Sequence, residues 1–269
     1  MNSFAVLVDC PDSYFDILEV FFACLNRHWP ERKATIYVTT NEKDIKSLEN
    51  TVFIKCGNNL NSIERSKIAL NSIKESYLLI LDCDCFFFGD ISEDYLNYLV
   101  AEMKNNRFNY VRLWKTPNKE QKKYKTQTPS LYFCNKKARY SKCLMANLWK
   151  KETYLEEVVS SGEDGWSIES KWLAESKNET EGFFENHCYC DSDPLHILHG
   201  ILKGRWIRKA LRKLLKFGFI KKEDIVRKKV SIGQTFKYNC SMFLMNHISS
   251  KTVYKLKKII GRNKFVSND

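Results

Sequence analysis

Residues 79–90 have the sequence LILDCDCFFFGD, which sets the main expectation for this chain. An apolar run over 77–81 ends at two carboxylates, Asp82 and Asp84, which lie two positions apart. Ligands of open α/β sheets bind outside the carboxyl ends of the strands, so these acids stand where a site is expected. On an extended backbone the two side chains would point to the same side and could bind one cation. Carboxylate oxygens suit Mg²⁺ or Mn²⁺. The plain alternative is that they only end a strand and solvate a turn.

The segments around this motif alternate between strand-like and helix-like patterns, which is typical of a parallel α/β sheet. We expect strands at 4–8, 34–39, 52–55, 77–81, 110–114 and 130–134, and helices at 16–26 and 62–74. An exposed lysine-rich loop is expected at 115–125, and the pattern from residue 136 onward indicates mainly helix. The predicted fold class is therefore α/β, with a central, mostly parallel sheet.

Composition limits the class of protein. The 269 residues are 43% hydrophobic and 28% charged, as in globular rather than disordered chains. No apolar run reaches the roughly 18–20 residues that span a bilayer, and the first residues, MNSFAVLVDCPDS, lack the basic region and cleavage site of a signal peptide. We therefore expect a cytoplasmic protein rather than a secreted or integral membrane protein.

The 10 cysteines are scattered through apolar stretches without a CxxC pair, which favours reduced, buried thiols. A zinc site among His187, Cys188, Cys190, His196 and His199 is disfavoured, because the spacings are shorter than those of structural zinc sites.

Positive charge is concentrated near the C-terminus. Residues 203–264 contain 19 Lys and Arg against Glu223 and Asp224, whereas the whole chain has a net charge of +12. Such a block has three usual partners, namely nucleic acid, an anionic membrane or phosphorylated ligands, and it can also be a solvated face. Within it, 206–217 (WIRKALRKLLKF) separates an apolar face from a basic one. That helix would either lie on an anionic inner leaflet or pack its apolar stripe on the domain.

A family resemblance rests on two stretches. The run R-x-x-x-A-L-x-x-I-x-x-x-YLLILD-x-D-x-F over 65–86 resembles nucleotide-sugar-dependent glycosyltransferases of the GT-A fold, most of all bacterial enzymes of capsular and surface polysaccharide synthesis. The W-x-x-E at 166–169 and the HGILKGRW at 199–206 are similar to the later part of the same proteins. The resemblance implies a GT-A domain over 1–220, followed by a basic helical C-terminal extension over 221–269.

The activity that the resemblance implies is transfer of a sugar from a nucleotide-diphosphate donor, above all a UDP-sugar, to a glycan or lipid-linked glycan acceptor. The protein would then be peripheral on the inner face of the membrane, and no nucleic acid partner is expected. Two other classes stay open: a nucleic-acid-binding protein that uses the basic region, and a metal-dependent nucleotidyltransferase.

The donor-site residues implied by the resemblance lie in the first third of the chain. The loop from Asp9 to Asp12 would lie beside the base and ribose, and Arg65 would reach the donor sugar or pyrophosphate. Asp82 and Asp84 would hold the Mn²⁺ or Mg²⁺ that bridges the two phosphates and neutralises charge on the leaving group. The alternatives are an exposed helix arginine for Arg65 and a helix N-cap for Asp12.

A second constellation contains His196, His199, Gly200 and Lys203. It is similar to the His-x-x-Gly-x-x-Lys-Pro-Trp motif of retaining galactosyltransferases, in which the histidine binds the metal and the lysine contacts the diphosphate. Here isoleucine stands three positions before Gly200 and glycine replaces the proline. Both histidines therefore stay candidate metal ligands, and Gly200 and Lys203 are candidates for the diphosphate site.

The acidic stretch GEDGWSIE at 162–169 offers candidates for a catalytic carboxylate. An inverting transfer needs a general base for the acceptor hydroxyl, and Glu163, Asp164 and Glu169 are the candidates. Acids in the first turn of a helix also stabilise the helix dipole, which is the structural alternative. The sequence leaves inversion and retention both open.

Overall fold

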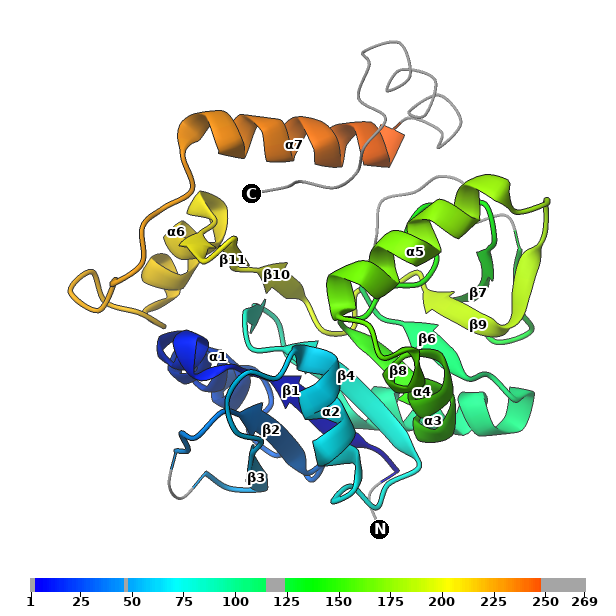
Figure 1. Ribbon diagram of the computed structural model, residues 1–269, viewed down its shortest axis with the longest axis horizontal. Coiled ribbons are helices and arrows are strands. Elements are labelled where there is room, and N and C mark those ends of the chain that lie inside the picture. Colours follow the sequence, from blue (N-terminus) through cyan, green and yellow to red (C-terminus); the bar gives the residue numbers. More distant parts are fainter. Residues whose placement is uncertain (1–2, 46–47, 115–123, 248–269) are drawn as a thin grey trace.

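The computed structural model describes residues 3–45, 48–114 and 124–247 (Figure 1). Eight strands form one sheet in the order β3-β2-β1-β4-β8-β6-β9-β7. Their bounds are β1 Ala5–Asp9, β2 Ile36–Thr40, β3 Thr51–Lys55, β4 Tyr77–Asp82, β6 Tyr110–Arg112, β7 Leu131–Asn135, β8 Asn147–Lys150 and β9 Phe183–Cys190. The first four are parallel, as are β6 and β9, whereas β8 and β7 run antiparallel to their neighbours. The predicted α/β class with a mostly parallel sheet is confirmed.

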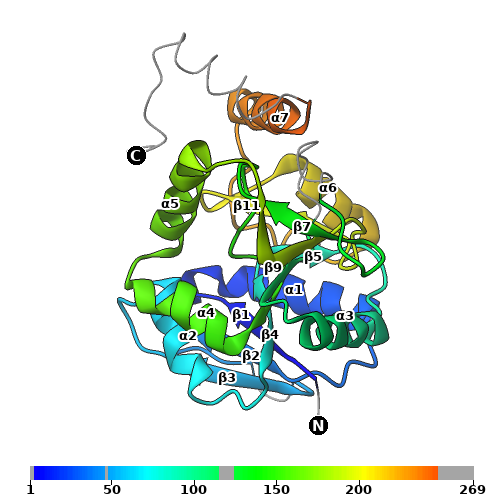
Figure 2. The ribbon, with the colours of Figure 1, turned by 90° about the vertical axis from the view of Figure 1, so that its right-hand side faces the viewer.

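Helices cover both faces of this sheet, which explains why its central strands are apolar throughout (Figure 2). The covering helices are α1 Phe15–His28, α2 Ser62–Leu70, α3 Glu93–Asn106, α4 Lys151–Glu157 and α5 Gly165–Asn178. Along β1, Val6 and Val8 belong to the core beneath α1 and α3, while Ala5 and Leu7 belong to the core beneath α2, α4 and α5. The alternation follows from the two-residue repeat of a strand.

Beyond the main sheet, the chain has four short strands and the two helices α6 and α7 within its described residues. Their bounds are β5 Cys85–Phe87, β10 Ile197–His199, β11 Ile201–Leu202, β12 Arg205–Trp206, α6 Arg208–Phe217 and α7 Ile232–His247. β10 pairs with β5, and β11 pairs with β12 in a hairpin. The apolar stripe of α6 packs on the domain, because Ala210, Leu211 and Leu214 are buried. In both ribbon views α7 stands apart from the sheet (Figures 1 and 2).

After residue 136 helix predominates, as expected, in α4, α5, α6 and α7, but the expectation missed the strands in that part of the chain. Five strands, β8 to β12, lie in that part of the chain. Most of them are two to four residues long, and β9 has polar Glu185 and Asn186 in its middle, so no two-residue apolar pattern marks them. Most of the loop expected at 115–125 lies outside the described residues.

Two expectations from the sequence concern the thiols and membrane-spanning segments. All ten cysteines are free, and eight of them are buried. No helix among the described residues is both long enough and apolar enough to cross a bilayer.

Candidate functional site

The first two carboxylates of the site come from neighbouring strands. Asp9 ends β1 and Asp82 ends β4, and the parallel pairing places these two residues directly opposite one another. Each strand stops where its apolar run meets an acid, so both acids project at the carboxyl edge of the sheet. The amide of Cys83 donates a hydrogen bond to the Asp9 carbonyl at 3.2 Å, which fixes the chain just beyond the two strand ends.

Asp84 does not continue the strand. Residues 83–84 form a turn between β4 and β5, so the extended backbone expected for Asp82 and Asp84 is wrong. The antiparallel pairing of β5 with β10 sets His199 opposite Cys85 and brings its Nε2 to 2.9 Å from Oδ2 of Asp84. The Gly200 amide donates to the Asp84 carbonyl at 2.9 Å. Asp84 is 7% exposed, and its Oδ1 is buried without a hydrogen-bond partner among the described residues.

His196 does not join this pair. It lies before β10, its carbonyl accepts from the Phe88 amide, and its ring lies against Gly89. His196 is outside the strand and has a φ of 48°, so it does not follow the side-chain alternation of β10. Of the two candidate histidines, the structure brings only His199 to Asp84.

Arg65 is not an exposed helix arginine. Its Nε and Nη2 atoms donate to the two oxygens of Asp9, each at 2.7 Å, and Nη1 donates to the carbonyl of Leu60. Arg65 is 6% exposed on α2, whose start is fixed by a capping box on Asn61. The hydroxyl of Thr39 also donates to Asp9, at 2.8 Å. Asp9 is therefore held by Arg65 and Thr39, and contact of Arg65 with the donor sugar or pyrophosphate stays a prediction.

Asp12 fixes a neighbouring loop. Its carboxylate accepts hydrogen bonds from the backbone amides of Asn41, Glu42 and Lys43, which follow β2. Asp12 is the first residue of a short 3-10 helix, Asp12–Tyr14, and it makes no capping hydrogen bond there, so the N-cap alternative is wrong.

The carboxylates perturb one another. Burial, followed by the charges of Asp84 and Asp9, raises the pKa of Asp82 to about 7. Burial alone would lower the pKa of His199, but its hydrogen bond with Asp84 and the surrounding carboxylates raise it overall. The cluster therefore has an excess of negative charge, which a bound cation would relieve.

The three acids of the 162–169 stretch have different surroundings. Asp164 is the N-cap of α5, where it accepts from the amides of Trp166 and Ser167, and it is exposed. Glu163 lies on a separate cavity, described below. Glu169 accepts from the amide of Leu144 at 2.9 Å, and burial raises its pKa. Its charge also acts on Asp82 and His199, so Glu169 is the acid of the three that belongs to the strand-end cluster.

Gly200 and Lys203 have structural reasons for their positions. A Cβ on Gly200 would lie 2.0 Å from Cε2 of Phe86, so only glycine fits beside that buried ring. Lys203 and Gly204 form the turn of the β11–β12 hairpin, both with positive φ. The hairpin lies next to Tyr14, whose pKa is raised first by burial and then by the charge of Asp84. Lys203 is thus near the site, at an exposed tip.

The residues present fit a divalent cation only if other ligands complete its shell. Within the described ranges, no three His, Cys, Asp or Glu side chains are placed together to hold a metal. The cluster does offer Asp84, with one unpartnered buried oxygen, beside Asp82 and His199. Mg²⁺ in such sites is bound by one or two carboxylates together with waters and substrate phosphates. The donor set therefore fits a cation that arrives with a phosphate ligand.

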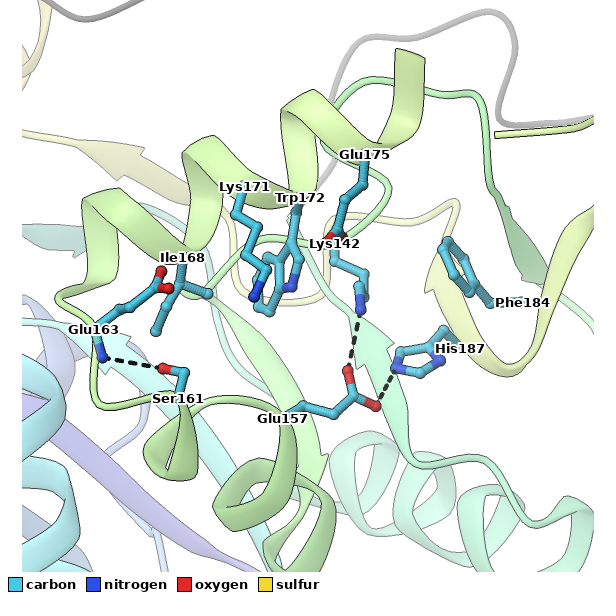
Figure 3. Close-up of a pocket in the computed structure, with 10 residues that line it drawn as sticks. All are labelled: Lys142, Glu157, Ser161, Glu163, Ile168, Lys171, Trp172, Glu175, Phe184 and His187. Atoms are coloured by element: carbon cyan, nitrogen blue, oxygen red, sulfur yellow. Dashed lines mark hydrogen bonds and ion pairs between the residues drawn. The ribbon is translucent and has the colours of Figure 1, made fainter. Parts of the chain in front are cut away.

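A separate cavity of about 410 Å³ lies between α5, the end of α4 and β9 (Figure 3). Lys142 Nζ and His187 Nε2 both approach the carboxylate of Glu157, at 3.1 and 3.2 Å. The rings of Trp172 and Phe184 flank the Lys142 ammonium, with centroids 4.8 and 5.3 Å away. Aromatic walls with charged groups at the base suit a polar ligand that has one apolar face.

Sequence patterns did not point to several of these residues. Thr39 lies in an ordinary strand, and the cavity groups Lys142, Glu157 and His187 come from three segments with no shared motif. The only sequence signal for Thr39 is the polar end of its strand, and that signal is weak.

Comparison with known proteins adds likeness at the level of the fold. No family model matches this sequence, and neither does any curated protein. The solved structure of S. aureus TarS is similar at 9% identity over 95% of this chain, with a TM-score of 0.43. This chain spans 45% of that TarS chain.

Two further solved structures are similar at comparably low sequence identity. A shorter TarS chain in complex with UDP-GlcNAc shows 10% identity over 95% of this chain and 76% of its own, with a TM-score of 0.43. An active-site mutant of LgtC shows 12% identity over 69% of this chain and 72% of its own, with a TM-score of 0.37. Likeness at this level leaves the function to be argued from the side chains.

Proposed function

We propose that the protein is a GT-A-type glycosyltransferase that transfers a sugar from a nucleotide-diphosphate donor, with UDP-sugars as the first candidates. The observation that supports it best is the pair formed by Asp84 and His199 at the carboxyl edge of the sheet, with a buried carboxylate oxygen left unpartnered. That edge is where ligands of open α/β sheets bind.

The charge of the cluster favours a diphosphate donor with its cation. Asp82, Asp84 and Glu169 would repel a bare diphosphate, so the donor would bind together with Mn²⁺ or Mg²⁺ held by Asp84, with Asp82 or His199. When bound, the cation neutralises charge on the departing nucleoside diphosphate. Asp9, oriented by Arg65 and Thr39, would accept hydrogen bonds from the nucleoside at the end of β1.

Glu169 is the proposed general base. It is partly buried beside the cluster, and burial raises its pKa towards the range in which a carboxylate can accept a proton near neutral pH. A carboxylate oxygen of Glu169 would take the proton of the acceptor hydroxyl. The hydroxyl oxygen would then attack the anomeric carbon as the bond from that carbon to the diphosphate breaks. This assignment belongs to an inverting transfer.

The cavity beside α5 is the proposed acceptor subsite. Glu169 and the cavity residue Trp172 lie one turn apart on α5, so an acceptor glycan at Glu169 passes near this cavity. The apolar face of a sugar ring would pack on Trp172 and Phe184, and its hydroxyls would bond with the charged groups (Figure 3). A surface polysaccharide or its lipid-linked precursor is the acceptor class that we infer.

Thermal unfolding in the presence of nucleoside diphosphates, with Mn²⁺ or with EDTA, tests the donor and the metal together. A ligand at about a hundredfold its Kd stabilises the folded state by about 2.7 kcal/mol. We expect UDP to raise the unfolding temperature only with the cation present. Equal stabilisation by UDP in EDTA would overturn the proposed requirement for a cation. The lack of any response to nucleoside diphosphates would overturn the proposed function.

A further inference from the structure

Helix α7 presents an apolar stripe to solvent. Ile232, Phe236 and Phe243 are 75%, 69% and 59% exposed. At 3.6 residues per turn these positions lie within about 40° of one another around the helix axis. Val226, just before the helix, is 76% exposed as well. We call these four side chains the α7 apolar surface. Large apolar side chains that are exposed along one side of a helix mark interaction sites in soluble proteins.

The surroundings of this surface are strongly basic. Residues 203–247 contain 13 Lys and Arg against Glu223 and Asp224. Lys228, Lys229 and Lys237, which adjoin the α7 apolar surface in sequence, are all exposed. Arg227 differs, because it pairs with Asp16 at 2.7 Å and so ties the segment before α7 to α1. The segment before α7 is therefore attached to the domain, and exposed lysines lie close to the α7 apolar surface along the chain.

This charge selects the partner. A second copy of the chain would place one strongly positive surface against another, which the net charge opposes. Nucleic acid would satisfy the lysines and could stack bases on Phe236 and Phe243, but it offers no apolar phase for the aliphatic side chains of Val226 and Ile232. An anionic lipid bilayer satisfies both features, since headgroups attract lysines and the acyl boundary accepts apolar side chains.

We propose that α7 docks the protein on an anionic membrane surface, with Phe236 and Phe243 inserted at the acyl boundary and the flanking lysines on the headgroups. This moves membrane binding from α6, whose apolar stripe is buried in the domain, to α7. The inference does not depend on the proposed sugar transfer, and its test uses no sugar substrate.

Co-sedimentation of the full chain with vesicles tests it. One set of vesicles contains phosphatidylcholine alone and the other also contains phosphatidylglycerol. We expect binding to the anionic vesicles that weakens with salt, because charges are screened within about 10 Å at 0.1 M. Replacing both phenylalanines, Phe236→Ser with Phe243→Ser, should weaken binding at least about tenfold, since each removes apolar area that would be buried at the acyl boundary.

The control is Tyr98→Ser, which removes an aromatic side chain that is 40% exposed on α3. It should bind vesicles as the wild type does, and circular dichroism should show all variants folded. Equal binding to neutral and anionic vesicles, or undiminished binding by the double serine variant, would overturn the proposal. A wild-type dimer in solution that the two serine substitutions dissociate would also overturn it. So would duplex DNA that binds the protein at least as tightly as the anionic vesicles do.

Discussion

His199 Nε2 lies 2.9 Å from Asp84 Oδ2, although the two residues come from opposite halves of the chain. The contact exists because β10 pairs with β5, so the C-terminal segment closes over the edge where β1 and β4 end. Whatever binds at the strand ends is therefore held by both halves of the chain at once.

Replacing Asp84 should remove cation-dependent binding of UDP. Asp84→Asn keeps the shape of the side chain but not its charge, and an interaction with a charged group contributes about 1.5–3 kcal/mol. We expect the Kd for UDP in Mn²⁺ to rise by roughly ten- to a hundredfold in isothermal titration calorimetry. Asp90→Asn, a change at an exposed acid that follows β5 in the chain, should leave the Kd unchanged. Wild-type affinity in Asp84→Asn would contradict the site.

Arg65→Gln should destabilise the fold. It leaves the carboxylate of Asp9 without its bidentate partner, and breaking a buried ion pair costs about 3–5 kcal/mol. The free energy of unfolding from urea denaturation should fall by that amount. Lys67→Gln, an exposed change on the same helix, should alter it by less than about 0.5 kcal/mol. Unchanged stability with weaker UDP binding would instead place Arg65 at the donor.

Glu169→Gln should lower turnover by roughly 10²–10⁴-fold, the usual contribution of a positioned general base, while the Kd for UDP stays the same. The matched amide variant Asp164→Asn should keep near-normal turnover, because Asp164 caps α5 and asparagine caps as well. Glu163→Gln, at the proposed acceptor cavity, should change the KM for the acceptor rather than the turnover. Turnover is measured as UDP release with acceptor. Loss of turnover in Asp164→Asn alone would move the base to Asp164. Near-normal turnover in all three variants would favour a retaining mechanism.

Gly200→Ala should disturb the Asp84–His199 pair through packing. The new Cβ would overlap the ring of Phe86, which is fully buried and stacked on Trp206, and such overpacking costs about 1–3 kcal/mol. Denaturant unfolding should show this loss, and Phe86→Leu in the same chain should restore part of it. Gly233→Ala in α7, where nothing lies within 4 Å of the new Cβ, is the control and should be neutral or stabilising. Equal effects of the two alanines would refute this packing account.

The ion pairs in the cavity should make stability depend on acid pH. Burial alone would raise the pKa of Glu157, but His187 and Lys142 outweigh it and lower the pKa from 4.5 to about 2. A lowered folded-state pKa stabilises the protein above the unfolded value, and this contribution is lost as the pH falls from about 4.5 through about 2. Glu157→Gln should lack that part of the pH dependence when unfolding is followed between these values. Parallel wild-type and variant curves would refute the lowered pKa.

The sequence alone determined the first half of the sheet and the place of the acids. The run at 77–81 is apolar throughout because a strand covered on both faces needs no alternation, and β1 and β4 each end at an acid that is excluded from the core. The α/β class and the importance of the segment around Asp82 and Asp84 follow from these local facts.

Only the tertiary structure decided which residues meet. The three acids at 162–169 are equivalent in sequence, but the packing of α5 turns Glu169 to the cluster and leaves Asp164 as a cap. The choice of His199 over His196 depends on the register of β10 with β5, since a one-residue slip in a strand reverses which side chains face the site. Register and helix rotation are set by contacts between segments far apart in the chain, and a local pattern does not contain them.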